Sequence, residues 1–254
     1  MSPSSKKARK PRAAPKVVDL STRAQRQLIG SIGFWLPLLL WLIAGWRPTP
    51  PLPQWTPLNS VSAYYYTGAV SFFAGALIAL ALFLFSYRGY ANDYGRRDRI
   101  AACIAGGAAV LVVYFPVDTP DPSLGFLWWM PYMGTIHALS AAVLFSSFIF
   151  FALFQFPRSN SEKADLPTEK RVRNGIYRAC GLVMVICTVW AFTAGIRRAP
   201  VFLPEVIALE AFAVSWLVKG RADETAAAAG KRAVHYARHP RKLADDAMNK
   251  IRGR

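Results

Sequence analysis

The sequence predicts an all-α fold, a polytopic membrane bundle of six transmembrane helices with both termini in the cytoplasm. Hydrophobic residues make up 54% of the 254-residue chain, and they gather in six blocks separated by charged segments. Only 18% of the residues are charged, and 28 of the 31 lysines and arginines fall on one side of the membrane that the blocks predict. This composition excludes a disordered chain, a disulfide-stapled secreted scaffold and an ordinary soluble enzyme.

The first three apolar blocks are each close to the length of a transmembrane helix. A helix that crosses about 30 Å of hydrocarbon needs about 20 mostly apolar residues. The first block, Leu28 to Trp46, has that length and contains Pro37. The second runs from Tyr66 to Tyr87 and the third from Ile100 to Val117. We expect the first block to act as an uncleaved signal anchor, because no small-residue cleavage pattern follows it.

The last three blocks complete the membrane domain. They cover residues 132–156, 176–196 and 201–218, and the sixth is short and contains Glu205 and Glu210. In a soluble protein, six helices that are apolar all round would need a polar shell of comparable size, and the connecting loops are too short to supply one. The sequence therefore predicts a six-helix transmembrane domain over residues 28–218.

The basic residues predict the orientation of the six spans. They are concentrated in residues 1–27, 88–99, 158–178 and 219–254, whereas the other side of the membrane has three arginines, at positions 47, 197 and 198. The positive-inside rule places the lysine-rich and arginine-rich segments in the cytoplasm. An even number of spans independently puts both termini on one side. We therefore expect a multi-pass protein of the cell inner (plasma) membrane.

The two tails are expected to contact the membrane surface. Residues 1–27 lack apolar periodicity and are predicted to be a disordered basic cytoplasmic tail. Residues 219–254 are rich in alanine and charge, and they are predicted to be a basic cytoplasmic tail that is partly helical. The expected partners are membrane lipids, through anionic headgroups at the cytoplasmic face, and not nucleic acid. Binding to a protein partner and assembly into a homo-oligomer are further possibilities that the sequence leaves open.

Several polar residues are predicted to lie in the outer half of the bilayer. Ionisable groups inside a span are costly, and so they are candidates for function. At a rise of about 1.5 Å per residue, Glu210 lies deepest and His137 about one and a half turns below the outer end of its helix. An outer-leaflet polar pocket would gather these side chains. The pocket candidates are Glu210, His137, Asp118, Tyr64, Tyr65, Tyr66 and Glu205. Interhelical hydrogen bonding is the structural alternative, above all for His137.

No catalytic or metal-binding residues are predicted. Only one histidine, His137, falls within a span, whereas an intramembrane zinc hydrolase needs several. The three cysteines lie inside predicted helices as small apolar residues, and no cofactor is expected. The leading hypothesis is a non-catalytic protein that binds a lipid, a small amphiphile or a membrane partner in the outer pocket. The alternatives are a lipid hydrolase with Ser140 or Ser215 near His137, and a proton-coupled transporter that uses Glu210.

Five segments of the chain resemble a group of uncharacterised membrane proteins. They are YYYTGAVSFFAG (64–75), FLFSYRGY (83–90), IHALSAAVLF (136–145), RNGIYRACGLVM (173–184) and EVIALEAFAVSWLVKG (205–220). In order and spacing they are similar to bacterial six-helix proteins of the "domain of unknown function 998" family, with a looser likeness to the Frag/DRAM/Sfk group. The resemblance covers about residues 30–220. It implies an integral membrane protein whose biochemistry is not established.

Overall fold

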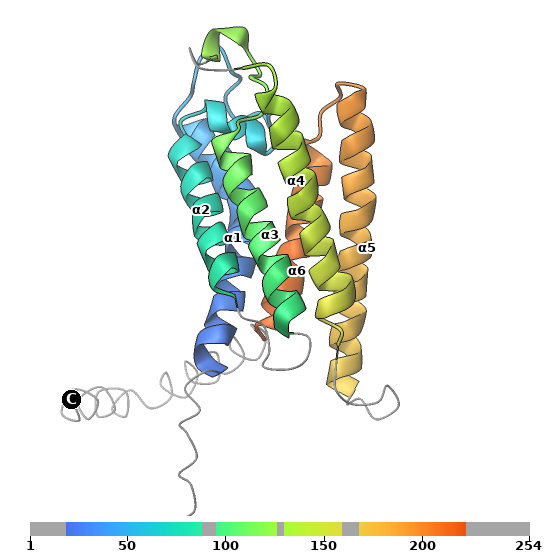
Figure 1. The fold of residues 1–254 in the computed structure, drawn as a ribbon. Coiled ribbons are helices and arrows are strands. Elements are labelled where there is room, and N and C mark those ends of the chain that lie inside the picture. Colours follow the sequence, from blue (N-terminus) through green and yellow to red (C-terminus); the bar gives the residue numbers. More distant parts are fainter. Residues whose placement is uncertain (1–18, 88–94, 126–129, 159–167, 222–254) are drawn as a thin grey trace, which may run out of the picture.

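The computed structural model describes residues 19–87, 95–125, 130–158 and 168–221 (Figure 1). In this part of the chain there are six long helices and no strand, so the predicted all-α class is confirmed. The long helices are α1 (Asp19–Trp46), α2 (Val70–Ser86), α3 (Gly95–Tyr114), α4 (Met133–Phe150), α5 (Thr168–Ile196) and α6 (Phe202–Lys219). The short elements are the 3₁₀ turns η1 (Ser62–Tyr66) and η2 (Pro122–Leu124) and the π-helical turn η3 (Phe151–Gln155), which continues α4.

Three helices begin earlier than the apolar blocks predict, and one of them is α3, which starts at Gly95 rather than Ile100. Helix α1 starts at Asp19, inside the tail that was predicted to be disordered, and α5 starts at Thr168 rather than near residue 176. Their added turns are polar, so apolar length alone gives no signal for them. Residues 1–18 and 222–254 lie outside the described residues, and so do the predictions for most of both tails.

Two other boundaries differ for local backbone reasons. The tyrosine run forms η1, and Thr67 after it is extended at φ −119° and ψ 175°, so α2 starts only at Val70. Helix α3 ends at Tyr114 rather than near residue 117. Pro116 explains this end, because a proline disfavours the helical conformation of the residue before it.

The six long helices form a closed antiparallel ring. Each helix packs against the next in chain order, and α6 packs back against α1. We call the end that carries η1 and η2 the upper end, and the end where α1 begins the lower end (Figure 1). The contact between α4 and α5 is among the least extensive in the ring, and these helices diverge toward the upper end. At the lower end η3 contacts α5 and joins the two helices.

Small residues and stacked aromatic side chains hold the six helices together. Helices α1 and α6 approach closely at two glycines of α1, where a Cβ on Gly30 would lie 2.9 Å from the backbone nitrogen of Leu217 and one on Gly33 would lie 2.7 Å from the Phe212 ring. Phe212 in turn stacks on Phe148 of α4, with ring centroids 3.8 Å apart. Close approach at small residues is typical of helices packed in membranes.

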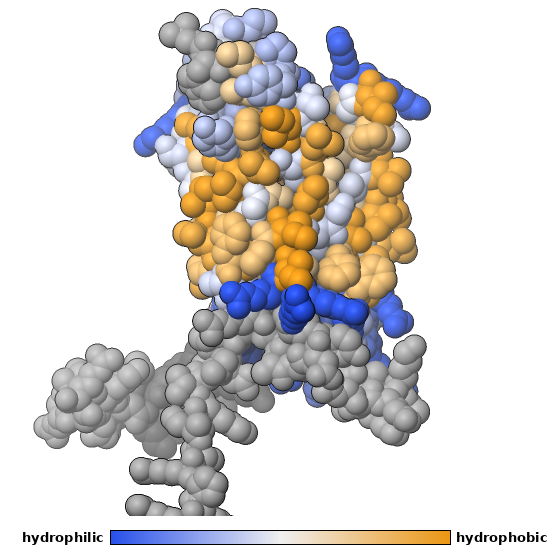
Figure 2. Space-filling view, in the orientation of Figure 1, coloured by the Kyte–Doolittle hydropathy of each residue, from blue (hydrophilic) through white to orange (hydrophobic). Residues whose placement is uncertain are grey.

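The side chains that face outward at mid-height are apolar. Figure 2 shows an orange hydrophobic band between bluer ends. Large exposed apolar side chains include Leu82, Leu139 and Phe192, at 63%, 64% and 68%. A water-soluble bundle would turn such residues inward, and an apolar surface of this extent marks contact with lipid or a partner. Among the described residues, three helical segments are long and apolar enough to cross a membrane: Arg23–Trp46, Met133–Gln155 and Thr168–Ile196.

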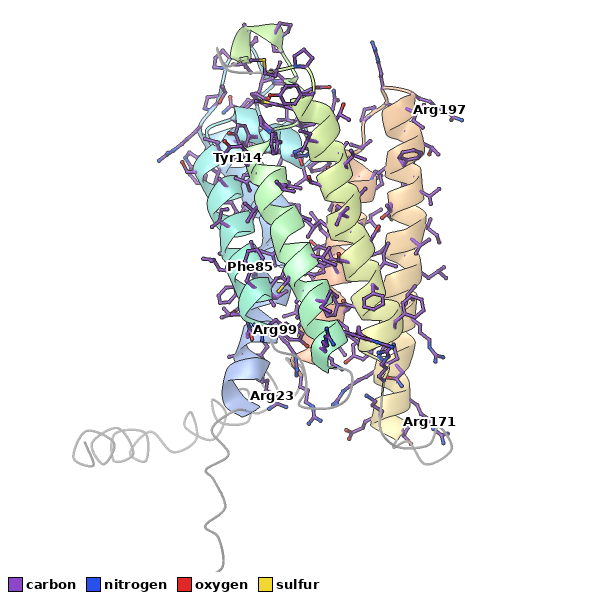
Figure 3. The ribbon with its side chains drawn as sticks, in the orientation of Figure 1. Arg23, Phe85, Arg99, Tyr114, Arg171 and Arg197 are labelled. Atoms are coloured by element: carbon purple, nitrogen blue, oxygen red, sulfur yellow. The ribbon has the colours of Figure 1, made fainter. Side chains whose placement is uncertain are left out.

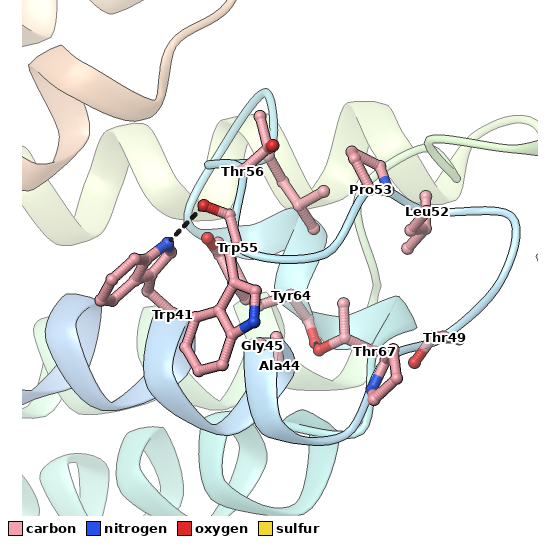
Figure 4. Close-up of a pocket in the computed structure, with 12 residues that line it drawn as sticks. Trp41, Ala44, Gly45, Thr49, Leu52, Pro53, Trp55, Thr56, Tyr64 and Thr67 are labelled. Atoms are coloured by element: carbon pink, nitrogen blue, oxygen red, sulfur yellow. Dashed lines mark hydrogen bonds between the residues drawn. The ribbon is translucent and has the colours of Figure 1, made fainter.

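The proline-rich segment after α1, residues 47–60, folds back on that helix. The ring of Trp55 packs against Gly45, and Trp41 Nε1 donates a 3.2 Å hydrogen bond to the carbonyl of Trp55 (Figure 4). The space left between the segment and α1 is about 10 Å³. A single water needs about that much, so this contact is a packed cap and not a binding site.

The glycines predict an asymmetric response to added side chains. Gly30→Ala should lower the free energy of unfolding by about 1–3 kcal/mol, because the new methyl group meets the backbone of α6. Gly75→Ala is the matched control, since nothing lies within 4 Å of a Cβ there, and its stability should stay level or rise. Unfolding in mixed micelles titrated with sodium dodecyl sulfate measures both. Equal losses in the two variants would contradict the close packing of α1 on α6.

Candidate functional site

A cavity of about 510 Å³ opens at the upper end, between α4, α5 and α6. Its volume lies within the range of about 300–1,000 Å³ that small-molecule sites occupy. Along α4 its lining extends from Gly134 to Phe145, a drop of about 16 Å at the helical rise. Along α5 it extends from Cys187 to Ile196. The cavity therefore fills the space where α4 and α5 diverge, and it reaches into the middle of the bundle.

The walls of the cavity are mostly small or apolar, and its acidic side chains lie near the top. Alanines at positions 138, 141, 142 and 191 keep the space open. Asp118, His137 and Glu205 line the cavity toward its upper end, and Thr188 lines it deeper, next to Cys187. Three of the seven predicted pocket residues thus come together here. This arrangement, apolar below and polar above, matches the two ends of an amphiphile.

Glu205 is held at the cavity by the segment that precedes η1. It lies in the first turn of α6, and its Oε2 accepts a 2.6 Å hydrogen bond from the backbone N–H of Val61. The backbone N–H groups of Val201 and Phe202 donate to the carbonyl of Asn59, at 2.7 and 2.9 Å. These bonds tie the start of α6 to the loop. A carboxylate near a helix N-terminus is also favoured by the helix dipole.

His137 joins α4 to the end of α3. Its Nδ1 lies 3.1 Å from the carbonyl oxygen of Val112 and 2.8 Å from that of Phe115, and its side chain is 5% exposed. Carbonyl oxygens only accept, so Nδ1 carries a proton, and in the neutral ring Nε2 is an acceptor. Asp118 packs against Gly134 at the start of α4, where any side chain on Gly134 would collide with its carboxylate.

The tyrosine run supports the site without lining it. The Tyr66 hydroxyl donates a 2.6 Å hydrogen bond to the carbonyl of Val117, which is itself a cavity residue. Burial, with smaller contributions from Tyr65 and Asp118, raises the pKa of Tyr66 to about 12, so the phenol stays protonated as a donor. Tyr64 is buried against Phe202, and Tyr65 packs edge-on against Tyr66. The three rings therefore position the loop and the end of α3.

Glu210 does not join the other candidates. It lies on α6 three residues after Ile207 and four before Val214, and these two side chains are 36% and 39% exposed. Residues with this spacing share one face of a helix, so Glu210 lies on the outward face of α6. It is half-buried and is not among the residues that line the cavity. The structure therefore separates Glu210 from His137.

The serines considered for a hydrolase do not form a nucleophilic pair with His137. Ser215 donates to the carbonyl of Phe212 within its own helix at 2.7 Å. Ser140 is buried on α4, and the two hydrogen bonds of His137 go to backbone carbonyls of α3 rather than to a serine. Within the described ranges, no group of three or more His, Cys, Asp or Glu side chains is placed to hold a metal ion.

A second polar cluster, which sequence reasoning missed, lies at the lower end. It is centred on η3: Gln155 Nε2 donates to Asp98 of α3, and the next residue, Phe156, accepts a 3.0 Å hydrogen bond from Lys219 Nζ through its carbonyl. Asp98, Gln155 and Lys219 are 8%, 6% and 9% exposed. A π-helical turn inside a helix often marks a functional position. The helix that starts at Gly95 carries Asp98 into the bundle, although the sequence pattern places this residue in a loop.

The lower cluster also includes the start of α1. Arg26 Nε lies 3.4 Å from the Tyr87 hydroxyl, and its guanidinium is 5.6 Å from the centre of that ring. Tyr87 packs edge-on against Trp216, with centroids 5.3 Å apart. Figure 3 places further arginines, Arg23, Arg99 and Arg171, at this end, and Arg197 at the upper end, extending away from the bundle. The lower end is therefore basic and holds a buried polar cluster, while the upper end has the cavity between α4, α5 and α6.

Comparison with family models, curated proteins and solved structures finds no match to this chain. The resemblance to uncharacterised six-helix bacterial membrane proteins stays a prediction, and the functional argument depends on the geometry alone.

The lower cluster predicts a large cost for losing its carboxylate. Asp98→Ala leaves Gln155 without its acceptor and removes the negative charge near Lys219. The free energy of unfolding should fall by about 2 kcal/mol or more. Glu169→Ala is the control, because Glu169 is 84% exposed and pairs with Arg173 at 3.7 Å on the surface of α5; it should change stability by about 0.5 kcal/mol or less. Detergent unfolding titrations that give the two variants the same stability would contradict a buried cluster.

Proposed function

We propose that this chain is a six-span plasma-membrane protein that binds an amphiphile, such as a lipid, in the cavity between α4, α5 and α6. The cavity itself carries the proposal. It is polar at the top and apolar below, and the face of α5 beside it exposes the apolar side chains of Val189 and Trp190. A ligand with one polar end and one hydrocarbon end satisfies both parts, whereas a wholly polar ligand would leave the lower walls without favourable contacts.

The way α4 and α5 diverge supports entry from the side. The two helices are in contact mainly near the lower end, where η3 packs against α5 and the side chain of Leu153 packs against Gly181. Above that point, the cavity side of α5 presents Ala191 and Gly195 to the space. The small side chains leave room between the helices. An amphiphile dissolved in the outer leaflet would therefore reach the cavity without crossing water.

The orientation in this proposal puts the cavity on the outer side and both termini in the cytoplasm. Arginines at the lower end support it, because the positive-inside rule keeps basic residues in the cytoplasm. Of the six spans, three meet the criteria of length and apolarity on their own. The other three, α2, α3 and α6, pack into the same ring and lie along the same axis.

Labelling at two introduced cysteines tests this topology. In a chain whose native cysteines are replaced, Thr56→Cys lies in the exposed cap and Glu169→Cys lies at the exposed start of α5. A membrane-impermeant maleimide applied to intact cells should label Thr56→Cys at once and Glu169→Cys only after permeabilisation. The reverse pattern, or recovery of the intact chain in a detergent-free supernatant, would contradict the proposed membrane orientation.

Filling the cavity tests the binding proposal. Ala191→Trp puts a large ring into the cavity, while Val189→Trp puts the same ring on the 57%-exposed outward face of α5. Dodecylamine, dodecanol and laurate are titrated into each variant in phosphatidylcholine nanodiscs, and calorimetry measures binding above partition into the lipid. At least one amphiphile should bind the unmodified chain and Val189→Trp, with affinity for Ala191→Trp reduced about tenfold or more. Equal binding to both tryptophan variants would contradict a site in the cavity.

A further inference from the structure

The ionisable side chains that line the cavity all contribute hydrogen-bond acceptors. Asp118 and Glu205 contribute carboxylates, and His137 contributes Nε2 as an acceptor in its neutral ring, because Nδ1 already donates to the carbonyls of α3. No lysine or arginine is among the described residues that line the space. Arg197, near the rim, extends away from the bundle (Figure 3). An anionic head group would therefore meet carboxylates with no cation to balance them.

The carboxylate of Glu205 is held in place before any ligand arrives, and that of Asp118 lies close beside the start of α4. Glu205 is held by the 2.6 Å bond from Val61, which uses one of its two oxygens, and Asp118 is seated on the glycine at the start of α4. Glu205 lies in the first turn of α6, where the helix dipole favours a negative charge. A preorganised acceptor such as Glu205 binds a cationic donor without a cost in reorientation.

A deeper hydroxyl provides an independent sign of an occupant. Thr188 lines the cavity, and its Oγ1 is buried with no hydrogen-bond partner in the described structure. A buried hydroxyl without a partner costs about 1–3 kcal/mol. A ligand or water in the cavity would satisfy this oxygen. The cavity therefore has an unmet polar group below its acidic mouth as well as open acceptors at the mouth.

We infer that the cavity selects amphiphiles whose head group is an ammonium, with the cation at Asp118 and Glu205 and the hydrocarbon chain along α4 and α5. This inference rests on the proposed function and names the ligand class for the same site. An N–H donor of an ammonium group gives short, charge-assisted hydrogen bonds to carboxylates. The Nε2 of His137 accepts a further N–H. A neutral alcohol offers one donor without charge, and a carboxylate head offers none.

The dodecyl series separates the inference from the proposed function. In phosphatidylcholine nanodiscs at pH 7, dodecylamine should bind the unmodified chain about tenfold or more tightly than dodecanol, and laurate should bind least. If dodecanol or laurate binds as tightly as dodecylamine, and Ala191→Trp still blocks binding, the inference about the head group is wrong and the binding site stands. If none of the three binds, both the inference and the proposed function are wrong.

Charge-neutral variants assign the selectivity to the carboxylates. Glu205→Gln keeps an oxygen that accepts from Val61, and Asp118→Asn keeps the size of the side chain. Each should reduce the preference for dodecylamine over dodecanol, and the double variant should abolish it, while affinity for dodecanol stays within about twofold. Thermal unfolding reports whether each variant is folded. If Glu205→Gln is not folded, Asp118→Asn alone tests the role of the carboxylates. An undiminished preference in a folded variant would overturn the role of its carboxylate.

Discussion

The π-helical turn at the end of α4 is the constraint on which the bundle depends. Its last residue, Gln155, contacts Asp98 of α3, and the carbonyl that follows it accepts from Lys219 at the end of α6. Trp216 lies among the rings of Tyr87, Phe151 and Phe156 at the same level. Polar groups and rings from four helices are therefore fixed together at one end. With α4 and α5 joined there, their divergence above creates the cavity at the other end.

The polar residues at the upper end each have a structural and a chemical part to play. Glu205 ties α6 to the loop before η1, and His137 ties α4 to α3, yet both also face the cavity. A hydrogen bond to the backbone uses only some of the lone pairs or protons of such a side chain. Structural bonding and ligand binding are thus not alternatives for these residues. The bonds to the backbone fix the remaining atoms where a ligand meets them.

The sequence is sufficient to predict the helices, and it is insufficient to predict which way they face. Blocks of apolar residues identify all six long helices because hydrocarbon length is a local property. In a membrane bundle, however, the outward face is as apolar as the core, so the pattern along α6 gives no sign that the face shared by Glu210 and Ile207 points outward. The contact of Asp98 with Gln155 joins residues 57 positions apart. It depends on a π-helical turn that no local sequence motif predicts. The depth predicted from the sequence was enough to group His137, Asp118 and Glu205. All three lie near the upper ends of helices, where the connecting loops bring them together.

Two native thiols on α5 occupy different heights of this arrangement. Cys187 lines the cavity, and Cys180 is buried about 10 Å nearer the lower end, two turns along the same face. A small thiol reagent that arrives from above meets the first sulfur inside the open half, whereas the second is sealed by the closed half. The ratio of modification at the two sulfurs therefore reports whether α4 and α5 separate along their full length or only beside the cavity.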